Sequence, residues 1–192
     1  INKIVKVDVP LLGDVAHVLE DSIKLWKSKV YKINKSPLKE WWKTIDKWKE
    51  RDSLKYIIDK NIIKPQHALQ RLYELTKDKD VFVTTEVGQH QMWAAQYYKF
   101  NKPNRWITSG GLGTMGFGLP AAIGAQVAHP DKLVIDIAGE ASILMCIQEM
   151  STAIQHKLPV KSFRMNNQSM GMVRQWQELL HDKRYSHSYT DA

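Results

Sequence analysis

The sequence predicts an α/β fold in which helices flank an open parallel sheet. Two apolar runs, residues 133–138 and 158–165, are typical of buried strands. Residues 142–157, between them, have the length of the crossover helix that parallel strands require. A third short run, residues 81–84, predicts another strand upstream. Open parallel sheets bind ligands at the carboxyl ends of their strands, so the candidate binding residues are those that follow these runs.

Small and polar residues follow two of the predicted strands. Gly139 and Glu140 end the first run, and the paired Asn166 and Asn167 end the second. A carboxylate and an amide at nearby strand ends supply the oxygen ligands of Mg²⁺, which completes its shell with water and a substrate's phosphates. Gly139 lets the backbone approach such a phosphate. Together the two signals predict a metal–diphosphate site, whereas ordinary turns are the alternative for either motif alone.

Nine of the ten glycines lie within residues 88–171. The uncharged segment 109–128 predicts a glycine loop that faces a ligand, followed by a helix. In that helix Gly116, Ala121 and Gly124 are expected to allow close packing. The alternative is a tightly packed core helix with a flexible entry.

Gln89 and His90 follow the predicted strand 81–84 and begin a further predicted helix. Backbone N–H groups and the positive end of a helix at this edge favour anions. Both side chains are therefore candidate donors to phosphate oxygens. The alternative for His90 is a capping or core histidine.

Three segments follow one another in a fixed order, residues 86–96, 110–124 and 166–177. In these segments the sequence closely resembles the acetolactate synthase family of thiamine diphosphate-dependent enzymes, in its large, catalytic subunit. The resemblance is specific from about residue 64 onward. One departure is Glu140, because the family usually has the shorter Asp at this position.

The resemblance implies roles for individual residues. Glu140, Asn167 and Ser169 match the magnesium ligands, with Ser169 acting through its backbone carbonyl. Met172 and Trp176 match the wall of the substrate channel, for which plain helix packing is the alternative. The residues that match cofactor contacts are Gln89, His90, Gly113, Met115, Gly139, Ala141, Ser142, Asn167, Gly171 and Met172.

The family decarboxylates pyruvate and condenses the product with a second 2-oxo acid, the first common step of isoleucine and valine biosynthesis. The implied cofactors are thiamine diphosphate and Mg²⁺, with FAD in the full-length enzyme. The implied partners are pyruvate and 2-oxobutyrate, a second copy of the chain in a homodimer or homotetramer, and a small regulatory subunit.

The resemblance places the activating glutamate on an amino-terminal domain that has no counterpart in this chain. No catalytic residue is therefore assigned, and the chain alone is expected to be inactive. Two alternatives stay open: another thiamine diphosphate-dependent decarboxylase, oxidase or carboligase, and a cofactor-binding module without activity of its own.

Three parts are predicted along the chain. Residues 1–23 resemble the end of the family's middle domain, residues 24–64 form a basic linker with a helix, and residues 65–192 form a thiamine diphosphate-binding domain that is incomplete at its carboxyl end. The linker holds 13 of the 28 Lys and Arg but 5 of the 20 Asp and Glu, so the net charge of +8 lies there. The rest of the chain is neutral, and we expect no nucleic-acid partner.

The linker helix is predicted to begin with Ser36 as its N-cap and Pro37 in its first turn. Trp41, Ile45 and Trp48 recur at helical spacing and predict an apolar stripe that packs on a neighbouring domain, with lysines on the other faces. The alternative is a surface that binds nucleic acid or an anionic membrane.

Cys146 is the only cysteine and lies in an apolar segment predicted to be helical. It is interpreted as an inert core thiol, which fits a reducing compartment and a cytoplasmic protein. No apolar run approaches the ~18 residues of a membrane span, so no membrane partner is expected.

Overall fold

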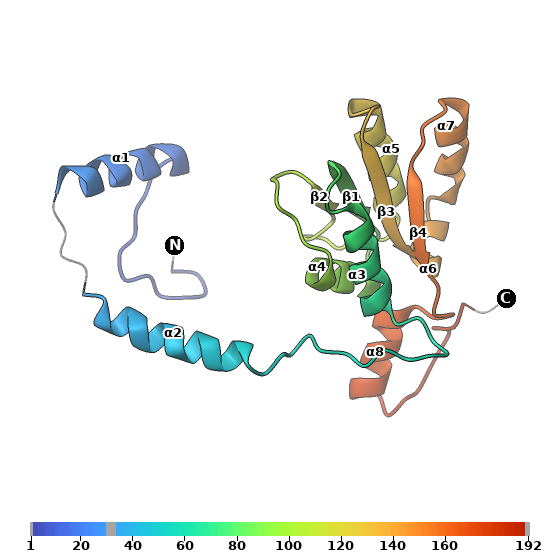
Figure 1. The fold of residues 1–192 in the computed structure, drawn as a ribbon, viewed down its shortest axis with the longest axis horizontal. Coiled ribbons are helices and arrows are strands. Elements are labelled where there is room, and N and C mark those ends of the chain that lie inside the picture. The colour runs from blue at the N-terminus through green and yellow to red at the C-terminus, as the bar shows by residue number, and fades with distance from the viewer. Residues whose placement is uncertain (1, 30–33, 191–192) are drawn as a thin grey trace. The chain divides into compact units, whose positions relative to one another are not determined.

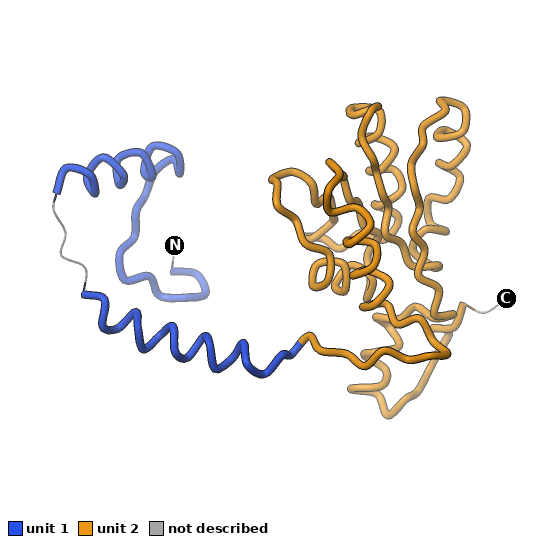
Figure 2. The backbone as a smooth tube through the Cα atoms, in the orientation of Figure 1, with its two compact units in different colours: residues 1–53 blue, residues 54–192 orange. Residues whose placement is uncertain are grey.

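The computed structural model describes residues 2–29 and 34–190. The chain forms two compact units, Ile1–Ser53 and Leu54–Ala192 (Figure 2). The first unit holds the helices α1 (Val15–Ser28) and α2 (Ser36–Lys49), in neither of which is a residue buried. Within the two described ranges, no helix is both long and apolar enough to cross a membrane.

Local hydrogen bonds explain where these two helices begin. The Asp14 carboxylate caps α1 by accepting two backbone N–H groups of its first turn. In α2 the N-cap position belongs to Lys35, so the prediction that Ser36 is the cap is wrong. The Asn34 side chain accepts the Ser36 N–H at 3.0 Å, and Ser36 is already helical. Pro37 lies in the first turn as predicted.

The apolar stripe predicted for α2 is present. Trp41 and Trp48 pack edge to face with ring centroids 5.5 Å apart, and Ile45 is half-buried. Another part of the helix surface carries an exposed ion pair between Lys43 and Glu40. The helix is therefore amphipathic, although exposed pairs of this kind add little to stability.

The second unit is an α/β fold, as predicted (Figure 1). In the described part of the chain, the sheet has four parallel strands in the order β2-β1-β3-β4. The strands are β1 (Val81–Thr85), β2 (Trp106–Thr108), β3 (Leu133–Gly139) and β4 (Lys161–Met165). The helices are α3 (Pro65–Thr76), α4 (Gln89–Tyr97), α5 (Gly118–Ala128), α6 (Glu140–Leu144), the 3₁₀ helix η1 (Ile147–Glu149), α7 (Met150–Gln155) and α8 (Gly171–Leu180).

The two central strands bury both of their faces, which explains their near-continuous apolar sequences. Alternate residues point to opposite sides of the sheet. Val83 and Ile135 pack in one cluster with residues of α3 and α4, whereas Phe82 and Val134 pack in another with α5. Figure 1 shows these helices as layers beside the sheet.

The crossover between β3 and β4 differs from the prediction of one helix over residues 142–157. It consists instead of α6, η1 and α7. Cys146 leaves helical geometry with a φ of −133°, and Met145 and Cys146 pack closely against Gly116 of the glycine loop. Cys146 is a free thiol as predicted, but it is half-buried in this break rather than in a helix.

The strand predicted over residues 158–165 is shorter and less buried than expected. β4 begins at Lys161, after Pro159, which has no N–H to donate to a sheet. The strand pairs with β3 on one side, and Lys161, Ser162 and Arg164 are exposed. It is therefore an edge strand in the described structure, not a buried one.

Close packing of α5 depends on Gly118, whereas the prediction that Gly124 provides it is wrong. A Cβ on Gly118 would overlap Asp136 Oδ1 and would lie 2.5 Å from the backbone nitrogen of Glu86. Gly124 faces open space. Gly116 does make a close approach, and its φ of +84° also favours glycine.

Replacing Gly118 by Ala is expected to lower the free energy of unfolding by about 1–3 kcal/mol, the usual cost of overpacking, because the added methyl group meets main chain. Chemical denaturation measures the change. The matched control is Gly124→Ala in the same helix, which is expected to be neutral or to stabilise by up to about 1 kcal/mol. Equal effects of the two substitutions would contradict the packing argument.

Candidate functional site

A cavity of about 550 Å³ lies at the carboxyl ends of β1, β3 and β4. The turns that follow these strands line it, together with the start of α8 and Met115 of the glycine loop. A second hollow of about 520 Å³ lies between β2 and α5, is more open and contains none of the predicted site residues. The first cavity is therefore the candidate site, in the position expected for an open parallel sheet.

Most of the predicted site residues meet in this cavity. Those that line it are Gln89, His90, Met115, Gly139, Glu140, Ala141, Ser142, Asn167, Ser169, Gly171 and Met172. Two others do not line it. Gly113 lies elsewhere in the glycine loop, and Trp176 lies further along α8 with about half of its surface exposed.

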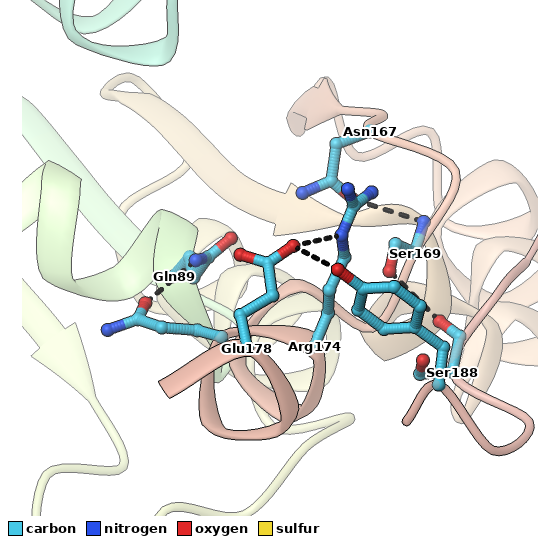
Figure 3. A network of polar contacts seen from close by, with 8 residues as sticks. Gln89, Asn167, Ser169, Arg174, Glu178 and Ser188 are labelled. Carbon is cyan, nitrogen blue, oxygen red and sulfur yellow. Dashed lines mark hydrogen bonds and ion pairs between the residues drawn. The ribbon is translucent and has the colours of Figure 1, made fainter. Parts of the chain in front are cut away.

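The three predicted metal ligands lie around one backbone amide. The Ser169 N–H donates to Glu140 Oε1 at 2.7 Å and to Asn167 Oδ1 at 3.2 Å. The Ser169 hydroxyl donates to the carbonyl of Ser188 at 3.0 Å, as Figure 3 shows, and so does not face a ligand. Among the described residues, no three His, Cys, Asp or Glu side chains gather as a metal site, so Glu140 would be the single carboxylate ligand.

The Glu140 carboxylate also has a partner far along the chain. Its Oε1 atom accepts the Thr190 hydroxyl at 2.9 Å. An isolated antiparallel bridge joins Ser169 to Tyr189, next to this contact. The segment that ends at Thr190 thus lies against the predicted metal ligands.

His90 is a buried, neutral side chain at the start of α4. Burial lowers the pKa of its imidazole to about 4, although the Glu86 carbonyl and the Glu140 charge act in the opposite direction. Its Nε2 atom is buried and has no hydrogen-bond partner in the structure. A Cβ on Gly139 would lie 2.8 Å from the ring, so the glycine makes room for it. A ligand atom that bonds Nε2 would satisfy this nitrogen.

Gln89 and Gly171 connect α4 to α8. The Gln89 amide donates to the side chain of Gln175 at 2.8 Å, the contact drawn in Figure 3. A Cβ on Gly171 would overlap the Gln89 side chain and would lie 2.8 Å from Asn167. Glycine at the start of α8 therefore lets three parts of the site come together.

Further along α8, an ion pair within the helix accepts a hydrogen bond from the segment that follows it (Figure 3). Arg174 Nε and the Tyr185 hydroxyl both donate to Glu178 Oε1, at 2.9 and 3.0 Å. These bonds hold the pKa of the Glu178 carboxyl below its usual range. The bond from Tyr185 holds the segment between α8 and Thr190 against the helix.

Glu86 is a site-adjacent residue to which sequence analysis assigned no role. It directly follows β1 and is fully buried. Its carboxylate accepts the N–H groups of Gly116 at 2.6 Å and Leu119 at 2.9 Å and the Ser142 hydroxyl at 3.0 Å. The only sequence signal is a charged residue between a buried strand and a glycine motif, and that pattern does not name the partners.

Asp136 is a second buried carboxyl, in the middle of β3. Its Oδ1 atom accepts the Thr84 hydroxyl at 3.0 Å, and its Oδ2 atom has no partner. Burial raises its pKa to about 7, and the nearby Glu86 charge contributes in the same direction. Sequence analysis treated this residue only as part of an apolar run.

A comparison with protein families identifies the type of domain that holds the cavity. The model described as "Thiamine pyrophosphate enzyme, C-terminal TPP binding domain" matches residues 86–192, which begin directly after β1 and include the turns that follow β1, β3 and β4. The chain belongs to this thiamine pyrophosphate enzyme family. Thiamine pyrophosphate is another name for thiamine diphosphate, so the predicted domain type is confirmed.

Individual relatives of the chain are acetolactate synthases, which confirms the resemblance found in the motifs. The chain is 53% identical to the large subunit of Buchnera aphidicola subsp. Acyrthosiphon pisum over 192 residues, and 48% identical to the isozyme 3 large subunit of Escherichia coli K12 over 192 residues. It is 46% identical over 193 residues to the mitochondrial catalytic subunit of Saccharomyces cerevisiae. These alignments cover 98–100% of this chain but 27–33% of each relative, so the chain spans about a third of their length.

The Asp136 carboxyl makes the stability of this thiamine pyrophosphate-binding domain depend on pH. Its folded-state pKa of about 7 exceeds the ordinary value of 3.8, so its stabilising contribution is complete below pH 3.8 and is lost as the pH rises through 7. Asp136→Asn removes this titration. Denaturant unfolding at two pH values measures the effect. The free energy of unfolding of the variant, relative to that of wild type, is expected to be roughly 3 kcal/mol higher at pH 8 than at pH 5.

The His90 imidazole is present in both wild type and Asp136→Asn, so its effect on stability cancels when the two proteins are compared. Parallel stability–pH curves for Asp136→Asn and wild type would contradict the prediction.

Proposed function

We propose that the protein acts as the catalytic subunit of an acetolactate synthase. The reaction decarboxylates pyruvate and joins the two-carbon unit to a second 2-oxo acid, giving a 2-aceto-2-hydroxy acid for branched-chain amino acid biosynthesis. The observation that carries this proposal is the meeting of motif residues from three strand ends in one cavity of a thiamine pyrophosphate-binding domain. The relatives' names supply the reaction class.

The cavity's own chemistry fits the diphosphate of this cofactor. The buried Nε2 of His90 lacks a partner, and a phosphate oxygen would give it one. The glycines at positions 88, 139 and 171 let the side chains of His90, Gln89 and Asn167 pack close to the backbone, since a Cβ there would come within 3.0 Å of them.

Thiamine diphosphate, when bound, supplies the carbanion chemistry. The chain's residues hold and orient it and exclude water. We assign Gln89, His90, Ala141 and Ser142 to the diphosphate. We assign Met115, Gly139, Asn167, Gly171 and Met172, which line the cavity, to the rest of the cofactor, together with Gly113, which belongs to the same glycine loop as Met115 but does not line the cavity. The activating glutamate is proposed to come from a part of the protein outside these residues.

Mg²⁺ is proposed to join the diphosphate to the protein through Glu140, Asn167 and the Ser169 carbonyl. The Glu140 and Asn167 side-chain oxygens both reach the Ser169 amide, which supports the assignment because such oxygens can also share one cation. The longer Glu140 side chain is stabilised by its bond to Thr190. Oxygen ligands of this kind favour Mg²⁺ over softer metals.

The substrates are proposed to be pyruvate and 2-oxobutyrate, with Met172 and Trp176 as the wall of their channel. Met172 lines the cavity, and Trp176 follows one turn later on α8.

For the intact enzyme we propose bound FAD, a homodimer or homotetramer, and a small regulatory subunit. The free Cys146 fits a cytoplasmic protein. We keep residues 1–23 as a middle-domain end, 24–64 as a linker and 65–192 as the cofactor domain.

Product analysis of the intact protein tests the proposed reaction. Pyruvate with thiamine diphosphate and Mg²⁺ is expected to give 2-acetolactate, and added 2-oxobutyrate is expected to give 2-aceto-2-hydroxybutyrate as well. Acetaldehyde or acetate as the only product would instead indicate a decarboxylase or an oxidase. Cofactor binding without turnover would indicate a binding module.

Substitution of Glu140 tests the metal assignment. Glu140→Ala removes the single carboxylate and is expected to weaken magnesium-dependent cofactor binding at least ~100-fold, whereas Glu140→Asp keeps a carboxylate and should largely preserve it. Calorimetry of the intact protein with Mg²⁺ and thiamine diphosphate measures both affinities. Thr190→Val, which removes one bond to Glu140 but no ligand, is the control and should lose much less. Wild-type affinity in Glu140→Ala would refute this metal site.

A further inference from the structure

Glu86 joins three separate segments through one buried carboxylate. Oε2 accepts the Gly116 N–H and the Ser142 hydroxyl, and Oε1 accepts the Leu119 N–H. Glu86 is 0% exposed, and no ion pair with it is found within residues 2–29 and 34–190. Removing a buried carboxylate from water is costly, so three donors in good geometry are what hold it there.

One of these segments, the loop that holds Met115, forms a wall of the candidate cavity, whereas α5 does not line it. Gly116 follows Met115, which lines the cavity, and Leu119 lies in the first turn of α5. The Leu119 N–H is one of the donors at the helix start that have no partner within the helix. The side chain of the N-cap residue of α5 does not bond any of these donors. The carboxylate thus satisfies the loop and the helix end together.

The third segment is the turn after β3. Ser142 lies two residues beyond Glu140, lines the cavity and is itself 2% exposed. Its hydroxyl donates to Glu86 and accepts the Val87 N–H at 3.4 Å. The hydroxyl therefore both donates and accepts a hydrogen bond inside the protein.

We propose that Glu86 is a positioning residue for the cofactor: it fixes the distance between the loop of Met115 and the turn of residues 140–142, across which the cofactor is held. The proposal rests on the thiamine diphosphate site of the proposed function. Glu86 touches neither cofactor nor substrate. It acts through Gly116, Leu119 and Ser142, whose donors all point at its charge.

Glu86→Gln in the intact protein tests the proposal. The amide keeps the size of the side chain but turns one accepting oxygen into a donor, so it faces at least one N–H or O–H without a bond. We expect the dissociation constant of thiamine diphosphate, measured by calorimetry with Mg²⁺, to rise at least ~10-fold. The kcat at saturating cofactor should change by less than about threefold, because no reacting group is removed.

A second measurement separates positioning from ordinary stability. Hydrogen exchange of the Gly116 and Leu119 amides should accelerate at least ~10-fold in Glu86→Gln, while β3 amides keep their protection. The matched control is Asp136→Asn, another fully buried carboxyl in the same region, which bonds Thr84 and neither the loop nor the turn. Its cofactor affinity should stay within about twofold of wild type.

The conservative variant covers the case in which Glu86→Gln does not fold. Glu86→Asp keeps the charge but reaches one methylene less far, and its cofactor affinity should lie between those of Glu86→Gln and wild type. Wild-type affinity and unchanged Gly116 exchange in either variant would overturn the proposal. A lower folded fraction with normal affinity in the folded remainder would overturn it as well.

The same titration distinguishes this proposal from the proposed function. A wild-type protein that does not bind thiamine diphosphate with Mg²⁺ overturns the function and the cofactor role of Glu86 together. A wild-type protein that binds the cofactor, beside Glu86 variants that bind it equally well, overturns the role of Glu86 alone.

Discussion

The parallel pairing of β1 with β3 is the constraint on which the whole candidate site depends. In this register Thr85 lies beside Ile137, and the Glu86 N–H donates to the Ile137 carbonyl at 3.0 Å. β1 therefore ends beside Ile137, two residues before β3 ends at Gly139, and the turns that follow the two strands lie at the same edge of the sheet. A shift of one residue would turn the side chains of either strand to the other face of the sheet. The buried hydrogen bond from Thr84 to Asp136, which are partners in this register, opposes such a shift, so the core also determines the geometry of the cavity.

Each of the two paired strands brings one buried carboxyl group, Glu86 directly after β1 and Asp136 within β3. The two groups are stabilised in different ways. Glu86 is met by three donors, whereas Asp136 has one donor and a pKa raised to about 7. Gly118 brings the backbone of α5 against both, since a Cβ at that position would meet Asp136 and the Glu86 amide. The start of α5, Asp136 and Glu86 thus pack together beside the cavity.

Sequence patterns predicted the parts of the fold that local chemistry determines. The runs around Val83 and Ile135 became strands because continuous apolar residues suit a sheet covered on both faces. The glycine-rich segment became a loop followed by α5, and the asparagine pair was followed by α8. The cavity could be anticipated because a parallel sheet brings its strand ends together.

What the sequence did not predict depends on contacts between distant segments. The break at Cys146 arises where the crossover packs on Gly116, thirty positions earlier. The partners of Glu86 lie 30 to 56 residues away, and no periodicity marks them. Gly118 and Gly124 look alike in sequence, yet only the folded chain distinguishes a glycine against main chain from one facing open space. The cap of α2 was missed because Asn34 competes with Ser36 for the same turn.

The Thr190 contact has a consequence for the order in which this protein takes shape on the ribosome. The sheet strands lie within residues 81–165, so they can pair while the rest of the chain is still being made. Glu140, however, receives the Thr190 hydroxyl only after fifty more residues have been added and have emerged. The cavity's outline is thus present before the Thr190 hydroxyl can bind and help to orient its carboxylate. A nascent chain stopped between these points would hold a folded sheet with an unfinished ligand site.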